Sequence, residues 1–259
     1  CVECDQASRT YTLDADFAEG TLVNVNYDDV PDQLQLDSEQ TPFEFIWVAA
    51  SMRGTIVKID TVTGDILGEY WSAPEPMAKN PSRTTVDGFG NVWAGNRNES
   101  SGGQGSVVKI GLEENGQCVD RNGNGVIDTS TGLGDIKAWT NAGGADTNGG
   151  VSTAADECII NYVRTAGTNV RTVAVTSDGT NDVWFGGLGN RAHQRHDSAG
   201  VPNSGILNVG QGGYGGLVDG NNVLWSAGAN SLLLRYDPAT FTPSFSSTLF
   251  SYGLAREKN

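Results

Sequence analysis

One short segment of the chain carries Asp or Asn at positions 120, 122, 124 and 128. Carboxylate, amide and backbone carbonyl oxygens are the ligands that Ca²⁺ prefers, and a glycine, here Gly125, permits the sharp bend that gathers them. The sequence therefore predicts a structural calcium site formed by Asp120, Asn122, Asn124, Asp128 and the backbone carbonyl of Val126. The alternative interpretation is a Gly- and Asn-rich turn that holds no metal.

This segment resembles the calcium loop of EF-hand and dockerin domains, with matching residues at the first, third, fifth, sixth and ninth positions. That loop has a bidentate acidic residue at its twelfth position, where this chain has Thr131. The resemblance therefore implies that another residue supplies the last ligand, and the candidates are Asp135, Glu113 and Glu114.

The chain has only two histidines, His193 and His196. They fall on a predicted strand, where a separation of three residues points the two side chains to opposite faces of the sheet. A shared metal ion or an acid/base pair is hard to build from such residues. We therefore expect two histidines that pack or lie exposed on a strand, and the sequence predicts no catalytic residue.

A further set of residues suits the binding of a sugar or a peptide. Aromatic rings offer stacking, and Arg and Asn side chains offer hydrogen bonds. The candidate ligand-binding residues are Trp71, Arg83, Asn96, Arg97, Arg191 and Tyr214. They can act together only if the segments that carry them meet at one end of the fold.

The elements that must position these residues follow from an internal repeat. An Asp and a Trp lie six residues apart in 87–93, 178–184 and 219–225, with a Gly- or Asn-rich turn between two β-rich runs. A second phrase carries a basic residue two positions before an Asp or a Gly, at Lys58, Lys109, Arg195 and Arg235. Small sheets copied in tandem bury both of their faces only by stacking on one another. The sequence therefore predicts an all-β fold, a β-propeller with tandem four-stranded blades.

The spacing of the repeats divides the chain. We expect an N-terminal segment over 1–31 that could supply a closing outer strand, blades over 32–255, and a tail over 256–259. The long gap between Trp93 and Trp184 predicts two insertions, over about 111–127 and 141–169, on either side of a strand at 135–139. About four to five blades fit in this chain. The ring could therefore be incomplete and closed by self-assembly or by another chain.

The repeated Asp-turn-Trp phrases resemble the streptogramin lyase-like and NHL-type propellers. The resemblance covers about residues 32–255 and implies the fold, which hosts many functions. For a streptogramin lyase it would also imply a histidine base with a Glu-x-His metal pair, and no Glu-x-His occurs in this chain. An extracellular lyase or hydrolase, with catalytic residues partly outside this chain, is the alternative function.

The four cysteines indicate the cellular compartment in which the protein resides. We expect a disulfide between Cys118 and Cys158, whereas Cys1 and Cys4 could form a second one or Cys1 could carry a lipid. Each of these interpretations places the protein outside the cytoplasm, because disulfides persist in oxidising compartments.

The charge of the chain narrows its partners. A net charge of −15 repels a phosphate backbone, so nucleic acid is not an expected partner. No apolar run reaches the roughly 20 residues that a membrane-spanning helix needs. We therefore expect a secreted or cell-surface, calcium-stabilised propeller that binds or assembles with a glycan or a protein.

Overall fold

The structure is a computed structural model of the whole chain, and it describes residues 10–18, 25–28, 30–36, 43–140, 150–208, 210–229, 232–240, 242–250 and 253–255. The chain divides into two compact units, Cys1–Phe43 and Glu44–Asn259. Cys1 and Cys4 lie outside the described residues, so the predictions for them stay predictions. Within the described ranges, no helix is long and apolar enough to cross a membrane.

The N-terminal unit contains one short helix and one small sheet. Helix α1 spans Asp14–Phe17, and strand β1 (Val25–Asn26) pairs antiparallel with β2 (Gln35–Leu36). Residues 19–24 and 29 lie outside the described residues, so the prediction of a closing outer strand stays a prediction. The boundary at 43/44 also lies later than the boundary at 31/32 that the repeats suggest.

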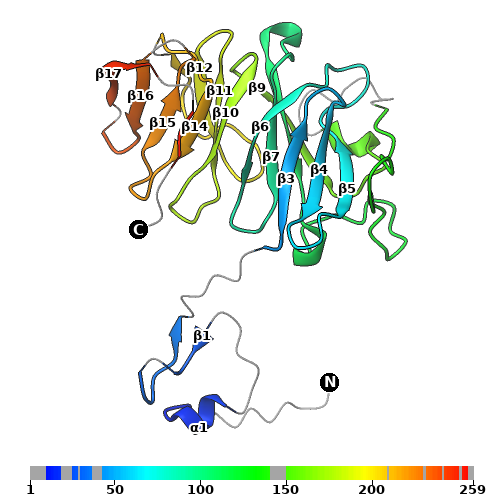
Figure 1. Cartoon of the computed structure of the whole chain (residues 1–259), viewed down its shortest axis with the longest axis vertical. Helices are drawn as coiled ribbons and strands as arrows, with labels where there is room; N and C mark the ends of the chain where they lie inside the picture. The colour runs from blue at the N-terminus through cyan, green and yellow to red at the C-terminus, as the bar shows by residue number, and fades with distance from the viewer. Residues whose placement is uncertain are drawn as a thin grey trace. The chain divides into compact units, whose positions relative to one another are not determined.

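The second unit is a row of four antiparallel sheets, which confirms the predicted all-β propeller architecture (Figure 1). The first sheet has three strands and the other three have four. In chain order the strands are β3 (Phe45–Ala50), β4 (Thr55–Asp60), β5 (Ile66–Trp71); β6 (Pro81–Val86), β7 (Val92–Asn96), β8 (Gly105–Ile110), β9 (Ile159–Thr165); β10 (Val170–Val175), β11 (Val183–Gly187), β12 (Ala192–His196), β13 (Leu207–Asn208); and β14 (Gly215–Val218), β15 (Leu224–Ala227), β16 (Leu232–Asp237), β17 (Thr242–Phe250).

The Asp-turn-Trp phrase builds the inner hairpin of each four-stranded sheet. Asp87 closes the turn between β6 and β7, because its Oδ1 accepts the backbone N–H groups of Phe89 at 3.0 Å and Asn91 at 3.1 Å. Asp219 does the same between β14 and β15. The turn needs a left-handed residue, which is Gly90 at φ 84° in the first of these turns and Asn222 at φ 62° in the second.

The basic residue of the second phrase lies directly across from the repeat Trp on the neighbouring strand. The register pairs Trp47 with Lys58, Trp93 with Lys109, Trp184 with Arg195 and Trp225 with Arg235. Lys109 lies 4.9 Å from the Trp93 ring centre and 3.2 Å from Asp87. Each of the three four-stranded sheets thus holds its turn Asp, its basic residue and its Trp as one unit.

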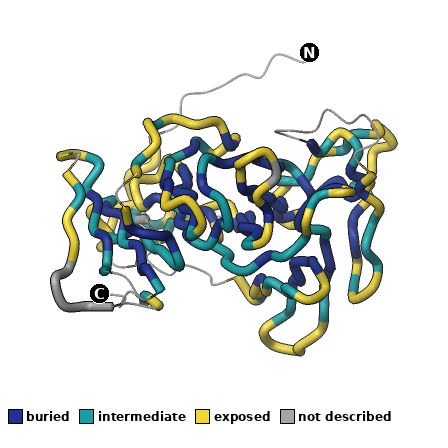
Figure 2. The backbone as a smooth tube through the Cα atoms, turned by 90° about the horizontal axis from the view of Figure 1, so that it is seen from above, coloured by how far each residue is buried: buried dark blue, intermediate teal, exposed yellow. Residues whose placement is uncertain are grey.

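The hydrophobic core lies between the sheets. Trp47 packs with Val92 and Ile110 of the second sheet, Trp93 with Phe185 of the third at 5.5 Å between ring centres, and Trp184 with Tyr236 of the fourth at 5.5 Å. Figure 2 shows buried residues gathered along the stacked strands and exposed residues on many of the turns. The repeat Trp residues therefore occupy matching places on successive sheets.

The structure corrects the prediction of two insertions. The fourth strand of the second sheet is β9, which pairs with β8 and lies inside the predicted insertion 141–169. Residues 111–158 therefore form one insertion, and the predicted Cys118–Cys158 disulfide is present across it. Its short 3₁₀ turns are η2 (Glu113–Asn115) and η3 (Gly150–Thr153), and a third, η1 (Ser101–Gly103), precedes β8.

The segment expected to form the fourth strand, 135–139, joins none of the sheets in the described part of the chain, and residues just before it bond the first sheet. The backbone N–H of Glu69 on β5 donates to Ser130 Oγ at 2.8 Å, and Gly134 donates to Glu69 Oε2 at 2.9 Å. Trp139 is buried in the core that β3–β5 share with the second sheet, and it makes a single bridge to Ala154. The insertion thus covers the outer strand of the neighbouring blade.

Candidate functional site

Two arginines and a tyrosine meet on the inner strands. The guanidinium carbon of Arg83 lies 5.0 Å from the centre of the Tyr214 ring, and that of Arg171 lies 4.6 Å from it. Arg83 Nε also donates to the backbone carbonyl of Tyr214 at 3.4 Å. We call these three residues the arginine-tyrosine cluster.

Neighbouring inner strands and two bulges position this cluster. Arg83 lies on β6, Arg171 on β10, and Tyr214 directly precedes β14; these are the innermost strands of the second, third and fourth sheets. The register of β6 shifts between Pro81 and Arg83, and that of β10 shifts between Val170 and Thr172. A bulge re-aims the side chain next to it. Both arginines therefore reach the same ring from different sheets.

The cluster carries positive charge that no described carboxylate neutralises. None of the ion pairs among the described residues includes Arg83 or Arg171. The Nε atom of Arg171 is buried and has no hydrogen-bond partner within the described part of the chain. Arginine forks match carboxylate and sulfate-like anions in geometry and charge. The cluster can therefore bind an anionic group.

The cluster contains two of the six predicted ligand-binding residues, Arg83 and Tyr214. Arg171 was not among the predicted residues, although both inner strands contain an Arg-Thr dipeptide, at 83–84 and 171–172. This shared dipeptide is the sequence feature from which Arg171 could have been predicted.

The other predicted residues have structural partners. Asn96 is fully buried and donates to the Ser72 carbonyl at 2.9 Å and to Ser106 Oγ at 3.1 Å. Arg97 Nε donates to Asn80 Oδ1. These contacts hold the connection between β5 and β6.

Two remaining predicted residues lie apart from the cluster. Lys79 Nζ lies 5.0 Å from the centre of the Trp71 ring. Arg191 is exposed, and its guanidinium donates to the Gly210 carbonyl at 2.9 Å. The structure therefore joins only part of the predicted set into one site.

The predicted calcium loop, 120–128, is closed by its own side chains. Asp120 accepts the backbone N–H groups of Gly123 at 2.7 Å and Gly125 at 2.8 Å. The amide nitrogens of Asn122 and Asn124 both donate to Asp128 Oδ2, at 2.7 and 2.9 Å. Three of the predicted ligands therefore already meet at one oxygen atom.

The amide oxygens of Asn122 and Asn124 accept backbone N–H groups, from Asn124 at 2.9 Å and from Val126 at 2.8 Å. Both amides would have to turn over, and these two hydrogen bonds would have to break, before their oxygens could face a calcium ion beside Asp128. Asp120 and Asp128 are the only carboxylates in the segment. No group of three or more His, Cys, Asp or Glu residues in the described ranges is placed to hold a metal ion. The oxygens would therefore come mainly from amides and backbone.

The candidates for the missing ligand have other partners. Asp135 accepts the backbone N–H of Thr131 at 3.0 Å and pairs with Lys137 at 2.9 Å. Glu114 pairs with Lys58. Glu113 lies in the turn η2, and no contact links it to the loop in the described structure.

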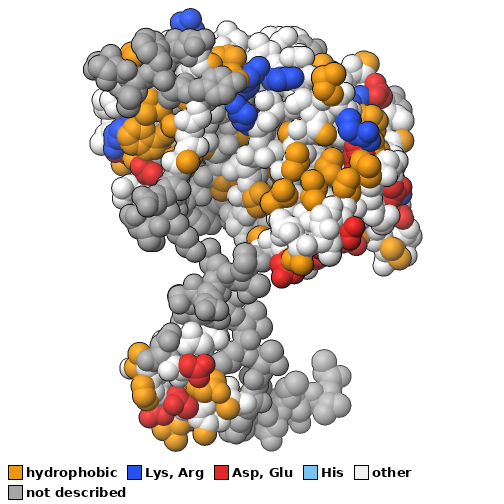
Figure 3. All heavy atoms as spheres, viewed as in Figure 1, with side chains coloured by type: hydrophobic (Ala, Val, Ile, Leu, Met, Phe, Trp, Pro, Cys, Tyr) orange, Lys and Arg blue, Asp and Glu red, His pale blue; other side chains and the backbone are white. Residues whose placement is uncertain are grey.

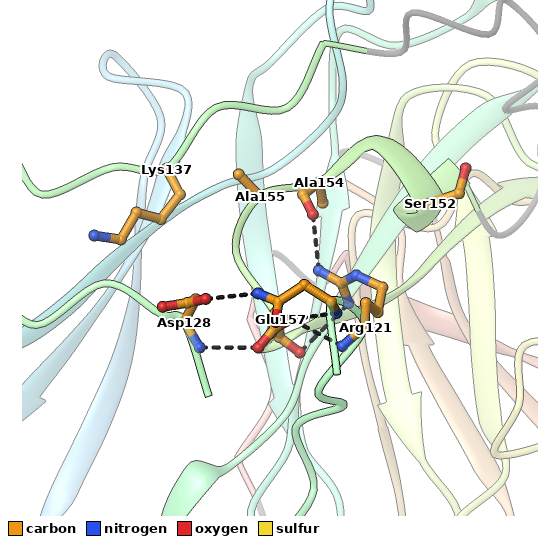
Figure 4. A pocket seen from close by; sticks show the side chains of 8 residues that line it. Arg121, Asp128, Lys137, Ser152, Ala154, Ala155 and Glu157 are labelled. Atoms are coloured by element: carbon orange, nitrogen blue, oxygen red, sulfur yellow. Dashed lines mark hydrogen bonds between the residues drawn. The ribbon is translucent and has the colours of Figure 1, made fainter. Parts of the chain in front are cut away.

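Glu157 holds the backbone of the 120–128 loop, a role that the sequence analysis did not predict. Its carboxylate accepts the backbone N–H groups of Arg121 at 2.8 Å, Asn122 at 3.1 Å and Asp128 at 2.9 Å. Figure 4 shows Glu157 between Asp128 and Arg121. The three residues line a cavity of about 510 Å³. Arg121 donates to the backbone carbonyls of Ala154 and Ile159, so its charge is used to hold this segment together.

The two histidines lie between the sheets and face opposite ways, as the sequence predicts. His193 Nε2 is 3.1 Å from Ser226 Oγ of the fourth sheet, and that hydroxyl is 2.9 Å from Thr172 Oγ1. His196 packs on Phe185, with ring centres 4.8 Å apart. Burial lowers the pKa of His193 to about 4 and also lowers the pKa of His196. Both imidazoles are therefore neutral packing groups at pH 7.

Comparison with known proteins shows the fold. No protein-family model matches the sequence, and no curated protein does. The structure is similar to hydrazine synthase of Kuenenia stuttgartiensis, with a TM-score of 0.50 and 10% identity over 78% of this chain and 46% of that one. It is also similar to a streptogramin B lyase, with a TM-score of 0.47 and 15% identity over 80% of this chain and 52% of that one.

A third similar structure is the Pan2 WD40 domain of Neurospora crassa, with a TM-score of 0.46 and 14% identity over 78% of this chain and 45% of that one. The chain thus spans about half the length of the solved proteins that it matches. At these identities the likeness concerns the propeller fold and not the activity.

Proposed function

We propose that this chain is an extracellular binding and assembly module of the propeller type, and that it recognises an anionic group on a glycan or a protein. The observation that carries the proposal is the arginine-tyrosine cluster. Its two guanidinium groups have no carboxylate partner in the described structure. Uncompensated arginines are unexpected in a chain with a net charge of −15 unless a ligand neutralises them.

The position of the cluster also supports binding. Propellers bring the inner strands of successive blades together around a central axis. The cluster draws Arg83 and Arg171 from two neighbouring inner strands and Tyr214 from the entry to the third. The face of Tyr214 is already covered by guanidinium groups. The ring therefore serves to orient the arginines, and a carboxylate or sulfate, more than a neutral sugar ring, is the chemistry that this cluster suits.

We further propose that a calcium ion stabilises the insertion in the second blade. Asp120, Asn122, Asn124, Asp128 and the Val126 carbonyl would hold the ion, and the ion would supply positive charge that rigidifies the loop. With two carboxylates the site would belong to the weak extracellular range, with a Kd of about 10⁻⁴ to 10⁻³ M. The Cys118–Cys158 disulfide supports the extracellular location.

Binding to two anionic probes tests the proposed function. Alginate oligosaccharides present carboxylates on a sugar, and an oligoglutamate peptide presents them on a protein. In calorimetry at low salt we expect one of them to bind, and we expect Arg83→Gln or Arg171→Gln to raise its Kd by about 10- to 100-fold, since each change removes a charge-assisted hydrogen bond.

Arg97→Gln is the matched control, because Arg97 lies at the end of the neighbouring strand and already bonds Asn80. It should leave the Kd unchanged. Binding of neither probe to the wild-type chain, or equal weakening by all three variants, would contradict the proposal.

A further inference from the structure

The contact between neighbouring sheets follows one rule. The residue directly before the repeat Trp packs against the Trp of the preceding sheet, and it is fully buried at Val92, Val183 and Leu224. Val92 shares a core cluster with Trp47, Val183 shares one with Trp93, and Leu224 shares one with Trp184. Each interface therefore joins a Trp face of one sheet to an aliphatic face of the next.

The first sheet presents an aliphatic face that no other described sheet of the second unit covers in this way. Ile46, which precedes Trp47, is 50% exposed, and Val48 is 39% exposed. Ile59 lies beside Ile46 in the register of β3 and β4. Figure 3 shows hydrophobic side chains gathered over β3–β5. We call Ile46, Val48 and Ile59 the open aliphatic face.

The fourth sheet presents the complementary half of the same interface. Trp225 is partly exposed, whereas Trp93 is 0% and Trp184 2% exposed in the interior of the row. Leu217 lies directly opposite Trp225 on β14, and Arg235 lies 5.9 Å from the Trp225 ring centre. We call Leu217, Trp225 and Arg235 the open Trp face.

We propose that the open Trp face of one copy of this chain docks on the open aliphatic face of a second copy. The two faces have the composition of the interfaces that already join the sheets inside the chain, so the docked copy continues an established contact. Because the faces differ, the contact is head-to-tail, and two such contacts close a ring of two copies. Eight sheets lie within the usual size of a propeller.

This inference is independent of the arginine-tyrosine cluster, which lies on the inner strands and takes no part in either open face. The two proposals can therefore fail separately. Loss of ligand binding with intact pairing would overturn only the proposed function.

Sedimentation velocity of the full chain, from about 1 to 100 μM, tests the pairing. We expect the mass of two chains at the upper end of this range. Ile46→Asp and Leu217→Asp should each raise the dissociation constant by about 100-fold or more, because each would bury a carboxylate in an apolar contact whose cation, Arg235, already pairs with Asp237 at 3.4 Å. Trp225→Ala is a second variant of the Trp face that introduces no charge.

Matched controls place the same charge outside the faces. Val62→Asp lies in the hairpin between β4 and β5, where Val62 is 73% exposed, and Phe245→Asp lies on β17 opposite Leu234, which faces the third sheet. Both controls should pair like the wild type. Circular dichroism checks that every variant remains folded.

Mixing the two face variants distinguishes a head-to-tail contact from a symmetric one. Ile46→Asp keeps its Trp face and Leu217→Asp keeps its aliphatic face, so an equimolar mixture should associate through one intact contact although neither variant pairs alone. A monomer at every concentration would overturn the proposal and leave these faces to another protein. A dimer that both variants leave intact, or a mixture that does not associate, would overturn it as well.

Discussion

At the residue scale, His193 shows how the stacked sheets control a titratable group. Its imidazole is fully buried and contacts Ser226 of the next sheet, and burial lowers its pKa from 6.5 to about 4. The unfolded chain therefore binds a proton between pH 6.5 and pH 4 that the folded chain does not bind. The free energy of unfolding therefore has its full value above pH 6.5. It falls by on the order of 3 kcal/mol as the pH drops from 6.5 to 4.

Urea denaturation at pH 7 and at pH 4.5 measures this loss for the wild type and for His193→Gln. The variant lacks the titratable ring, so its stability should fall less between the two pH values, although its stability at pH 7 is lower. The pKa of His196 is also lowered by burial, so part of the pH dependence should remain in the variant. An unchanged pH dependence in His193→Gln would show that His193 does not titrate as its burial implies.

At the element scale, the insertion 111–158 is the part of the fold whose order should depend on a metal ion. If calcium binds the 120–128 loop, it stabilises the folded state by about 2.7 kcal/mol at a concentration 100 times its Kd. Thermal unfolding in 10 mM calcium and in chelator should therefore differ in Tm for the wild type. Asp128→Asn should abolish this difference, because it removes one of the loop's two carboxylates, the one at which both amides meet.

The control for this experiment is Asp65→Asn, which removes the same charge from an exposed turn in the first sheet. Its response to calcium should equal that of the wild type. If chelator leaves the wild-type Tm unchanged, the loop is the Gly- and Asn-rich turn that the same residues also allow.

The insertion 111–158 also shows which part of the fold could not be predicted from the sequence. The blades could be predicted because one Asp, one left-handed turn residue and one Trp are fixed by local hydrogen bonding and recur at constant spacing. The partner of an edge strand is not fixed locally. Residues 129–136 match 61–66 in sequence, yet Ser130 and Gly134 bond Glu69 on the first sheet, and β9 takes the edge of β8.

The candidate site was only partly predictable for the same reason. Arg83 and Tyr214 could be chosen by residue type, but their meeting with Arg171 depends on the stacking of three sheets and on two bulges. Asn96 has an equally suitable residue type for binding, and burial commits it to Ser72 and Ser106. Residue type therefore predicts what a side chain can do, and packing decides whether it is free to do so.

At the scale of the whole molecule, equivalent tryptophans should differ in their contribution to stability according to what covers them. Trp93→Ala removes a ring from the closed interface between the second and third sheets, and it should cost about 3 to 5 kcal/mol at every protein concentration. Trp225→Ala changes an open face, so in dilute solution its cost should be about 1 kcal/mol. If a second copy covers that face, the cost of Trp225→Ala must grow as the concentration rises, since pairing stabilises only the wild type.

Denaturation of both variants and the wild type at two protein concentrations, 100-fold apart, measures this difference. An equal cost for Trp225→Ala at both concentrations would mean that nothing docks there, and an equal cost for both tryptophans in dilute solution would mean that the sheets do not stack as a row with two open ends.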